Sequence, residues 1–222
     1  MVRERTKAAR KDVNRSLLAY LNPSHPIAQQ FRAIRNNIQY ASDGKAITSL
    51  LITSPEEGDG KSTAAINLAI SMAQRGEHVL LIDANFRNPV LHKIFGTQMS
   101  PGLATVVGEQ LSLPEAVRRT EIEGLDLLTC GSAGAGTADL LDSPAMSALM
   151  ASAADRYDRV IIDCPAVLSS PDTNCLVGKS DGVVLLLHCG HTTHGKALEA
   201  KQALAFAGAN IVGAVLNKKN AR

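Results

Sequence analysis

Residues 49–63 read SLLITSPEEGDGKST, and this stretch decides the fold. The apolar run Ser49–Thr53 is typical of a buried strand and the residues after the turn favour a helix, so a glycine-containing turn joins a strand end to a helix start. Gly58 and Gly60 allow backbone N–H groups to point inward, while the helix N-terminus and Lys61 add positive charge. The stretch therefore predicts a phosphate-binding loop.

Six consecutive residues of this loop are candidates for contact with a bound nucleotide. They are Gly58, Asp59, Gly60, Lys61, Ser62 and Thr63. Lys61 is the candidate for the β and γ phosphates, and the hydroxyl of Ser62 is suited to bind Mg²⁺. We therefore predict a protein that binds a nucleoside triphosphate.

The composition narrows the class of protein. The chain has 222 residues, 45% of them hydrophobic, which suits one α/β domain with a single core. The net charge of +2 and the aromatic content of 3% argue against nucleic acid as a partner.

The four cysteines are widely spaced and predict neither a disulfide nor a metal site. No apolar run approaches the roughly 20 residues that cross a bilayer, so we expect a cytoplasmic protein.

Basic charge is concentrated near the N-terminus. Residues 1–15 hold six basic and two acidic side chains. We expect residues 1–25 to form a basic, flexible arm, with contact to acidic lipid or to a partner as the alternative. Residues 26–222 are expected to form a nucleotide-binding domain.

Short apolar runs alternate with longer helical patterns, which indicates a doubly wound, mostly parallel α/β sheet covered on both faces. The expected strands are 49–53, 78–83, 125–129, 160–163, 183–188 and 211–217, and the expected helices are 27–40, 62–74, 114–119, 144–154 and 196–207. Gly76 and Gly208 fall where helices should end. The small residues of 130–139 predict a surface loop, a linker or lid, rather than a second phosphate loop, because no Lys-Ser pair follows them.

Two of the expected strands end in an aspartate, Asp83 and Asp163. Because the carboxyl ends of parallel strands meet at one edge of a sheet, we expect both acids beside the phosphate loop. Asp83 can hold a metal-bound water or accept the proton of an attacking hydroxyl, and Asp163 can hold Mg²⁺ through water. The alternative for each is a surface aspartate that ends a strand. Two such acids together with a phosphate loop favour the functional interpretation.

From about residue 26 to residue 218, the chain resembles the cytoplasmic catalytic domain of the bacterial tyrosine kinases (BY-kinases) of capsule and exopolysaccharide systems. The matching segments are residues 26–38, 53–63, 82–89, 157–163, 180–182 and 213–218. The resemblance implies a P-loop fold of the septum-placement and plasmid-partition ATPase type, ATP and Mg²⁺ as cofactors, and transfer of the γ-phosphoryl group to tyrosine. It also implies assembly into oligomers and, as activator, a membrane protein with a polysaccharide chain-length-regulator domain, which would bring the kinase to the inner face of the membrane.

The resemblance further implies roles for single residues. The catalytic residues are Lys61, Asp83 and Asp163, and the metal ligands are Ser62, Asp83, Asn85 and Asp163. Asp83 and Asn85 are then the Walker A′ pair and Asp163 the Walker B acid. Asn217 would face the adenine, whose edge suits an amide that donates and accepts at once. The alternative for Asn217 is a turn residue that closes the last strand.

Four features depart from the family pattern. Asn85 stands where a second aspartate is usual, which removes one negative charge near the metal. Gln29 replaces the glutamate of the ring-forming Glu-x-x-Arg-x-x-Arg motif, so a subunit ion pair becomes at best a neutral hydrogen bond. Cys164 replaces a threonine with little change in volume. No tyrosine follows Tyr157, whereas family members usually end in a tyrosine-rich tail that is phosphorylated.

The missing tail leaves the phosphate acceptor open between Tyr20, Tyr40 or Tyr157 of another subunit and a separate protein. It also favours an alternative function, an ATP-dependent switch that controls assembly of a polysaccharide export complex without phosphotransfer. Glu56 argues against this switch, because it stands where partition ATPases carry a signature lysine. A scaffold that has lost ATP is disfavoured by the intact loop and strand-end acids.

Overall fold

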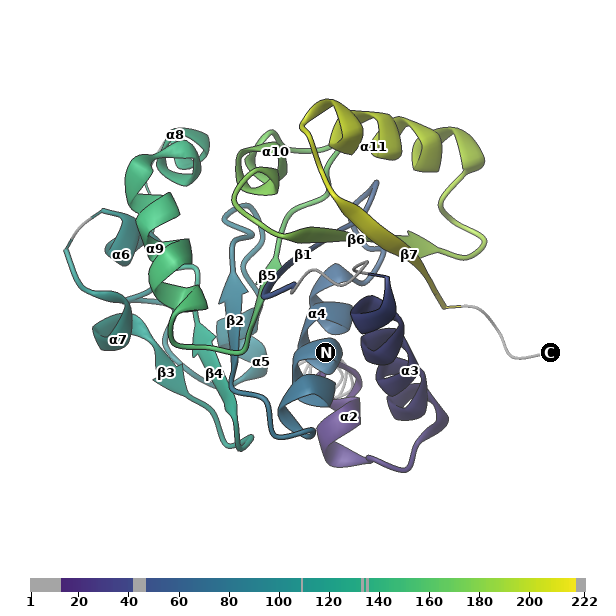
Figure 1. The fold of residues 1–222 in the computed structure, drawn as a ribbon, viewed down its shortest axis with the longest axis horizontal. Coiled ribbons are helices and arrows are strands. Elements are labelled where there is room, and N and C mark those ends of the chain that lie inside the picture. Colours follow the sequence, from purple (N-terminus) through teal and green to yellow (C-terminus); the bar gives the residue numbers. More distant parts are fainter. Residues whose placement is uncertain (1–12, 42–46, 109, 133, 135, 219–222) are drawn as a thin grey trace, which may run out of the picture.

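A seven-stranded, mostly parallel sheet forms the centre of the computed structural model, which describes residues 13–41, 47–108, 110–132, 134 and 136–218 (Figure 1). The strands are β1 (Ser49–Thr53), β2 (Val79–Asp83), β3 (Arg118–Arg119), β4 (Leu125–Leu128), β5 (Arg159–Asp163), β6 (Gly182–His188) and β7 (Ile211–Asn217). Their order is β3-β4-β2-β5-β1-β6-β7, with β3 antiparallel to β4 and the other pairs parallel. The predicted α/β fold is confirmed.

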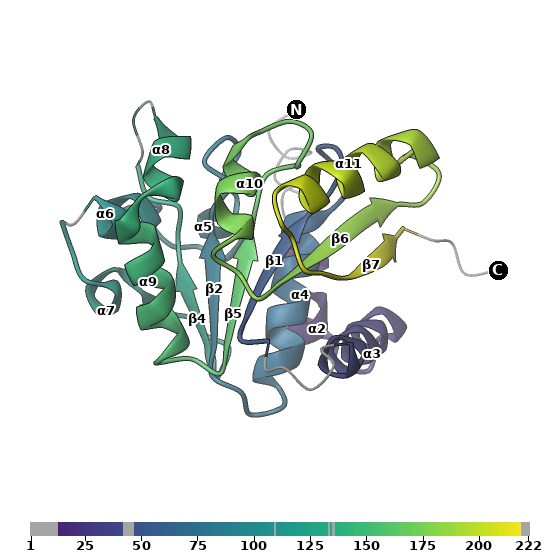
Figure 2. The ribbon, with the colours of Figure 1, turned by 45° about the horizontal axis from the view of Figure 1, so that its top comes forward.

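Helices cover both faces of this sheet (Figures 1 and 2). One face carries α2 (Leu18–Leu21), α3 (Pro26–Tyr40), α4 (Lys61–Ala73) and α5 (Leu91–Ile94). The other carries α6 (Leu103–Val107), α7 (Leu113–Ala116), α8 (Thr137–Asp142), α9 (Pro144–Ala154), α10 (Asp172–Val177) and α11 (His194–Phe206). In β1, Leu50 and Ile52 pack into the first layer and Leu51 into the second. A strand buried on both faces is apolar throughout, which explains the continuous apolar run.

The longer elements lie where the sequence predicts them. Each of the six expected strands agrees with the observed one to within one residue at either end, and four of the five expected helices agree to within two. Gly76 and Gly208 adopt positive φ of 93° and 79° just after α4 and α11, as expected for residues that end helices.

The fifth expected helix, 114–119, is wrong in its second half. A capping box of Ser112 and Glu115 starts α7, but the helix ends at Ala116. Val117 is extended, and Arg118 and Arg119 pair with β4 as the antiparallel edge strand β3. This pairing is tertiary, because the partner strand supplies the hydrogen bonds that continue the chain as a strand.

The sequence does not predict most of the short helices. The helices α2, α5, α6, α8 and α10 have four to six residues each, too few to show helical periodicity. The loop expected over 130–139 is therefore wrong at its end: α8 begins at Thr137, after Gly136 with a positive φ of 93°. Residues 133 and 135 lie outside the described residues.

The flexible arm expected over 1–25 is wrong for its described part, residues 13–25. The side chain of Asn67 on α4 accepts a hydrogen bond from the backbone N–H of Ala19 at 2.8 Å and donates to the carbonyl of Ser16 at 2.8 Å. Ala19 is buried against α4, so this segment belongs to the domain. Residues 1–12 lie outside the described residues. No helix in the described ranges has both the length and the apolar character that a membrane-spanning segment needs.

Candidate active site

The phosphate loop between β1 and α4 depends on two glycines. Gly58 and Gly60 have positive φ of 82° and 96°, a region that other residues rarely adopt, and Gly60 is the N-cap of α4. A Cβ atom at Gly60 would also collide with the side-chain nitrogen of Asn217. Both constraints require glycine, and they aim the N-terminus of a 13-residue helix at the loop.

A pocket of about 210 Å³ lies at this loop. It is lined by Glu57, Gly58, Gly60, Lys61, Ser62, Thr63, Asn85, Asn88, Val90, Pro165 and Ala166. Lys61 is only 6% exposed, and burial lowers its pKa because the charged form loses hydration, while the nearby Asp163 carboxylate acts in the opposite direction. The pocket thus combines a buried cation, a helix N-terminus and glycine backbone, a set that suits phosphate.

Asp83 and Asp163 lie side by side at the ends of β2 and β5, where they are directly paired in the register of the two strands. Both side chains are fully buried. Asp83 accepts hydrogen bonds from the backbone N–H groups of Asn85 at 3.2 Å and Leu91 at 3.1 Å. Neither carboxylate oxygen of Asp163 has a hydrogen-bond partner among the described residues.

This pairing has electrostatic consequences. Burial raises the pKa of both carboxyl groups, because the charged form loses hydration. At Asp163 the neighbouring Asp83 raises the pKa further, and the nearby Ser62 hydroxyl and Lys61 ammonium offset only part of this. Two buried acids beside a buried lysine therefore form a site where a divalent cation would replace a proton.

Asn85 takes part in the same site. Its side chain lines the pocket together with Ser62, and its oxygen accepts a hydrogen bond from the N–H of Asn88 at 3.2 Å. An aspartate here would add a carboxylate close to Asp83. The structure thus places the four predicted metal ligands, Ser62, Asp83, Asn85 and Asp163, at one edge of the sheet.

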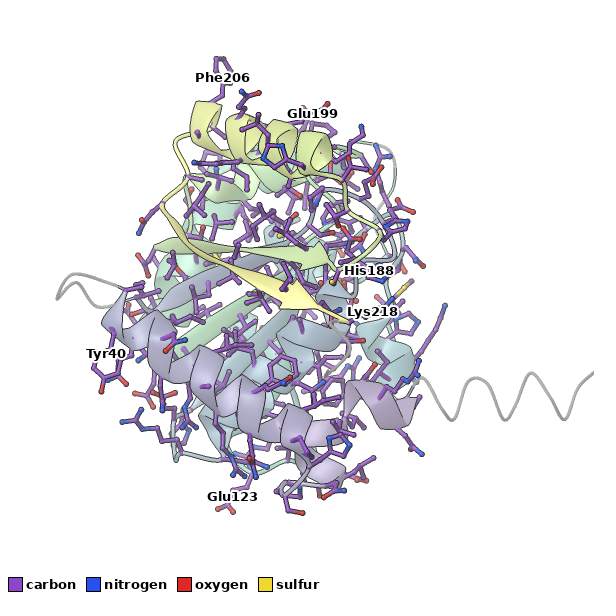
Figure 3. The ribbon with its side chains drawn as sticks, turned by 90° about the vertical axis from the view of Figure 1, so that its right-hand side faces the viewer. Tyr40, Glu123, His188, Glu199, Phe206 and Lys218 are labelled. Atoms are coloured by element: carbon purple, nitrogen blue, oxygen red, sulfur yellow. The ribbon has the colours of Figure 1, made fainter. Side chains whose placement is uncertain are left out.

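Asn217 at the end of β7 holds the phosphate loop. Its amide nitrogen donates to the carbonyl of Asp59 at 2.7 Å, and its oxygen accepts from the N–H of Lys218 at 2.9 Å. The ammonium of Lys218 lies 3.4 Å from the carbonyl of Gly58. Lys218 and His188 lie near each other at the ends of adjacent strands (Figure 3). The contact of Lys218 with the loop was not predicted, because nothing in the sequence indicates that this side chain turns back.

Asp59 differs from the other loop residues. Its side chain is fully buried but does not line the pocket. It faces His188 at the end of β6 and His191 in the segment between β6 and α11 instead. Of the six residues expected to contact nucleotide, Asp59 can therefore do so only through its backbone.

The motif residues of α3 make contacts within the chain. Arg32 donates to the carbonyl of Pro23 at 3.0 Å, and Arg35 donates to the carbonyl and, at 3.5 Å, to the hydroxyl of Ser71 on α4. Gln29 reaches the carbonyl of Ser24 at 3.5 Å. Both arginines therefore stabilise the packing of α3 in the single chain.

The three tyrosines differ in accessibility. Tyr40 is 83% exposed and projects from the end of α3 (Figure 3). Tyr20 is 39% exposed. Tyr157 donates its hydroxyl to Asp126 at 3.0 Å, and burial together with this acid raises the pKa of its phenol. Tyr40 is the tyrosine that another molecule reaches most easily.

Comparison with known proteins places the chain in a family. A family model described as an AAA domain matches residues 49–203. The chain is 39% identical over 207 residues to the tyrosine-protein kinase YwqD of Bacillus subtilis, covering 93% of this chain and 87% of that protein. The chain belongs to the AAA-domain family and, within it, to the bacterial tyrosine kinases. The family predicted from the sequence is confirmed, and it supports a tyrosine kinase over the nucleotide switch.

Solved structures agree with this bacterial tyrosine kinase assignment. The chimerical protein CapA2B2 superposes with a TM-score of 0.89 at 33% identity, covering 93% of this chain and 91% of that one. The septum site-determining protein MinD of Pyrococcus horikoshii, solved with Mg-ADP, gives a TM-score of 0.65 at 23% identity, covering 76% of this chain and 69% of that one. The second likeness concerns the fold alone, and it bears out the predicted septum-placement type.

Proposed function

We propose that this bacterial tyrosine kinase transfers the γ-phosphoryl group of ATP to tyrosine and so regulates exopolysaccharide or capsule production. The observation that carries the proposal is that Lys61 lies near the paired acids Asp83 and Asp163, beside the pocket at the phosphate loop. These three side chains come from three elements, and such convergence is what phosphoryl transfer requires.

The residues present fit a Mg²⁺-nucleotide. The fit rests on Asp163, whose two buried oxygens lack any partner in the described chain, with the Ser62 hydroxyl nearby. Oxygen ligands of this kind suit Mg²⁺. Ser62, Asp83, Asn85 and Asp163 would hold the ion or its waters, and Asn217 would meet the adenine with its remaining amide hydrogen. The ion, when bound, neutralises charge on the phosphates.

The chain's own groups have different roles in phosphoryl transfer. The backbone N–H groups of the loop and the N-terminus of α4 bind the phosphates, and Lys61 adds a full charge where negative charge develops. Asp83 is the candidate that accepts the proton of the attacking tyrosine hydroxyl, because burial raises the pKa of its carboxyl group and so makes the carboxylate a stronger base. The buried walls around both acids exclude water and strengthen these interactions.

The proposed partner is a membrane activator with a polysaccharide chain-length-regulator domain, which brings the kinase to the inner face of the membrane. The family resemblance supports this partner. The proposed acceptor within the chain is Tyr40 of another copy, because its side chain is exposed while that of Tyr157 is tied to Asp126.

One experiment tests the proposal. Purified protein, with and without its activator, is incubated with γ-labelled ATP and Mg²⁺, and phosphotyrosine is located by mass spectrometry. We expect label on tyrosine that requires Lys61. ATP turnover with nucleotide-dependent assembly but without phosphotyrosine on any partner would instead support the switch.

A further inference from the structure

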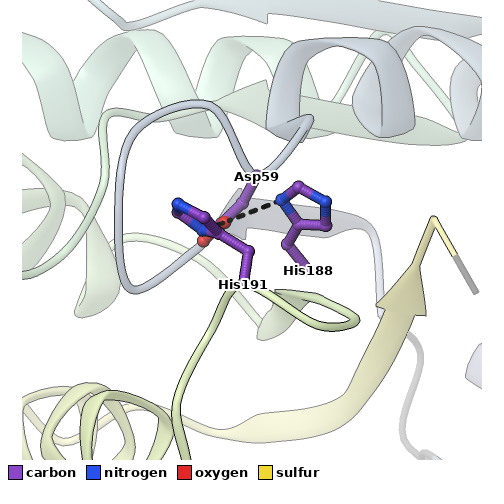
Figure 4. Close-up of side chains that lie close together, drawn as sticks. All are labelled: Asp59, His188 and His191. Atoms are coloured by element: carbon purple, nitrogen blue, oxygen red, sulfur yellow. Dashed lines mark ion pairs between the residues drawn. The ribbon is translucent and has the colours of Figure 1, made fainter.

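Asp59, His188 and His191 form a cluster at the phosphate loop (Figure 4), and none of the three lines the nucleotide pocket. Oδ1 of Asp59 lies 3.4 Å from Nδ1 of His191 and 3.8 Å from Nδ1 of His188. All three potential ligand atoms lie within 4.8 Å of one another. None of the three side chains is used by the proposed phosphoryl transfer.

We propose that these three side chains bind a divalent transition-metal ion of the zinc type and thereby clamp the phosphate loop to the segment between β6 and α11. Zinc bonds to imidazole nitrogen and carboxylate oxygen are about 2.0–2.2 Å, so neighbouring ligands of a tetrahedral site are roughly 3.3–3.6 Å apart. The separations of 3.4 and 3.8 Å are close to this value. The ligand atoms of the two histidines, which lie within 4.8 Å of each other, would move closer together when both bind the ion.

The state of the donor atoms supports a cation. The Asp59 side chain is fully buried, and a buried carboxylate is unfavourable without a compensating charge. Nδ1 of His188 is buried and has no hydrogen-bond partner among the described residues, although it points toward that carboxylate. Within the described ranges, Oδ1 of Asp59 accepts only a long hydrogen bond, from the Thr192 hydroxyl at 3.5 Å, so a metal ion would give Nδ1 of His188 a partner and compensate the charge of the carboxylate.

The surroundings of the three side chains orient them toward one another. The second oxygen of Asp59 accepts from the N–H of Glu56 at 3.2 Å, which orients the carboxylate. The two imidazole rings are stacked with centroids 5.0 Å apart, so their orientations are coupled. His191 is 53% exposed, which gives an ion a path from solvent and leaves a position for water.

The ligand set also selects the metal. One carboxylate and two imidazoles suit Zn²⁺ and similar transition metals, whereas Mg²⁺ prefers oxygen ligands in an octahedral arrangement. The ion would therefore be distinct from the Mg²⁺ of the nucleotide. Because Asp59 also accepts the amide of Asn217 through its carbonyl, the ion would connect β6, β7 and the phosphate loop.

The test measures metal binding without nucleotide, so its result does not depend on kinase activity. Tag-free protein is dialysed against Zn²⁺ with excess Mg²⁺, and bound zinc is counted. We expect one Zn²⁺ per chain and, at about 100 times the dissociation constant, a rise of about 5–10 °C in the unfolding midpoint. His188→Ala and His191→Ala should each weaken binding at least about 100-fold.

Two matched variants control for other ligands. His194→Ala changes an exposed histidine three residues after His191, and Cys189→Ser removes the exposed thiol that follows His188 in the chain; both should bind Zn²⁺ as the unchanged protein does. Absorption of the Co²⁺ complex of the unchanged protein should show nitrogen and oxygen ligation without a thiolate band, a readout that needs no variant to fold. Substoichiometric binding, unchanged binding by the His188→Ala, His191→Ala double variant, or loss of binding in Cys189→Ser would each overturn the proposal.

Discussion

Asp163 lies directly across from Asp83 in the register of β5 and β2, although 79 residues lie between them in the chain, and neither residue has solvent exposure. Asp83 is held by backbone N–H groups, whereas Asp163 has no hydrogen-bond partner among the described residues. Because the two buried acids differ in their hydrogen-bond partners, they are suited to different roles. Asp83 is fixed in place, and Asp163 is free to meet an ion.

The first prediction concerns the stability cost of this arrangement. Because the folded-state pKa of Asp163 lies above its unfolded value, this residue stabilises the fold at low pH and loses that contribution as pH rises. In EDTA and without nucleotide, Asp163→Asn should be nearest to the unchanged protein at about pH 4, near the unfolded pKa of an aspartate, and exceed its unfolding free energy by about 1–3 kcal/mol near pH 9. Denaturant unfolding at several pH values measures this. Asp155→Asn, at an exposed position, is the control, and equal pH profiles for the Asp163→Asn variant and the unchanged protein would contradict the prediction.

The second prediction concerns Lys61. Replacement by methionine keeps most of the length of the buried side chain but removes its charge, so the rate of phosphoryl transfer should fall on the order of 10³-fold or more while the fold persists. Initial rates with γ-labelled ATP check this, with Lys201→Met on the exposed face of α11 as the matched control. A fall of less than tenfold would remove Lys61 from its assigned role.

The third prediction concerns the departure at position 85. Asn85→Asp adds a carboxylate to the lining of the pocket beside Asp83, so the affinity for Mg²⁺ should increase and activity at limiting Mg²⁺ should rise. Without Mg²⁺, the extra negative charge should lower the unfolding midpoint. Titration of activity with Mg²⁺ measures the first effect, and thermal unfolding in EDTA measures the second. A lower activity at every Mg²⁺ concentration would show that this site has adapted to asparagine.

The fourth prediction concerns Gly60. Alanine here must adopt a positive φ and displace the amide of Asn217, so Gly60→Ala should lower the unfolding free energy by at least about 1–2 kcal/mol and weaken nucleotide binding. Gly195→Ala on α11 is the control, since nothing lies within 4 Å of its added carbon. Calorimetric unfolding and nucleotide titration measure the two effects. Nucleotide affinity that is the same in both variants would contradict the assigned role of the loop.

The fifth prediction concerns the acceptor. Tyr40→Phe should remove most phosphotyrosine from the chain itself, because Tyr40 is the most exposed tyrosine. Tyr157→Phe should cost stability through the lost hydrogen bond to Asp126 and leave phosphorylation unchanged. Site-resolved mass spectrometry distinguishes the two. Phosphate found mainly on Tyr157 would show that this side chain is released during the reaction.

The sequence by itself determined the elements whose signals are local. The continuous apolar runs predicted the strands, because strands buried on both faces have no polar face. The glycine turn with Lys61 and Ser62 predicted the phosphate loop, since its backbone conformation and charge are set within a few residues. Placement of Asp83 and Asp163 at one edge followed from the rule that parallel strands end together.

Only the tertiary structure decided which of these elements are neighbours. That β2 and β5 are adjacent, and so pair two buried acids, depends on the sheet order and not on any local pattern. The same holds for Arg118 and Arg119, which are strand because β4 lies beside them, and for residues 13–25, which are ordered by Asn67 of α4. The side chain of Asp59 turns from the pocket to two histidines about 130 residues away, because burial and charge act between segments that only folding brings together.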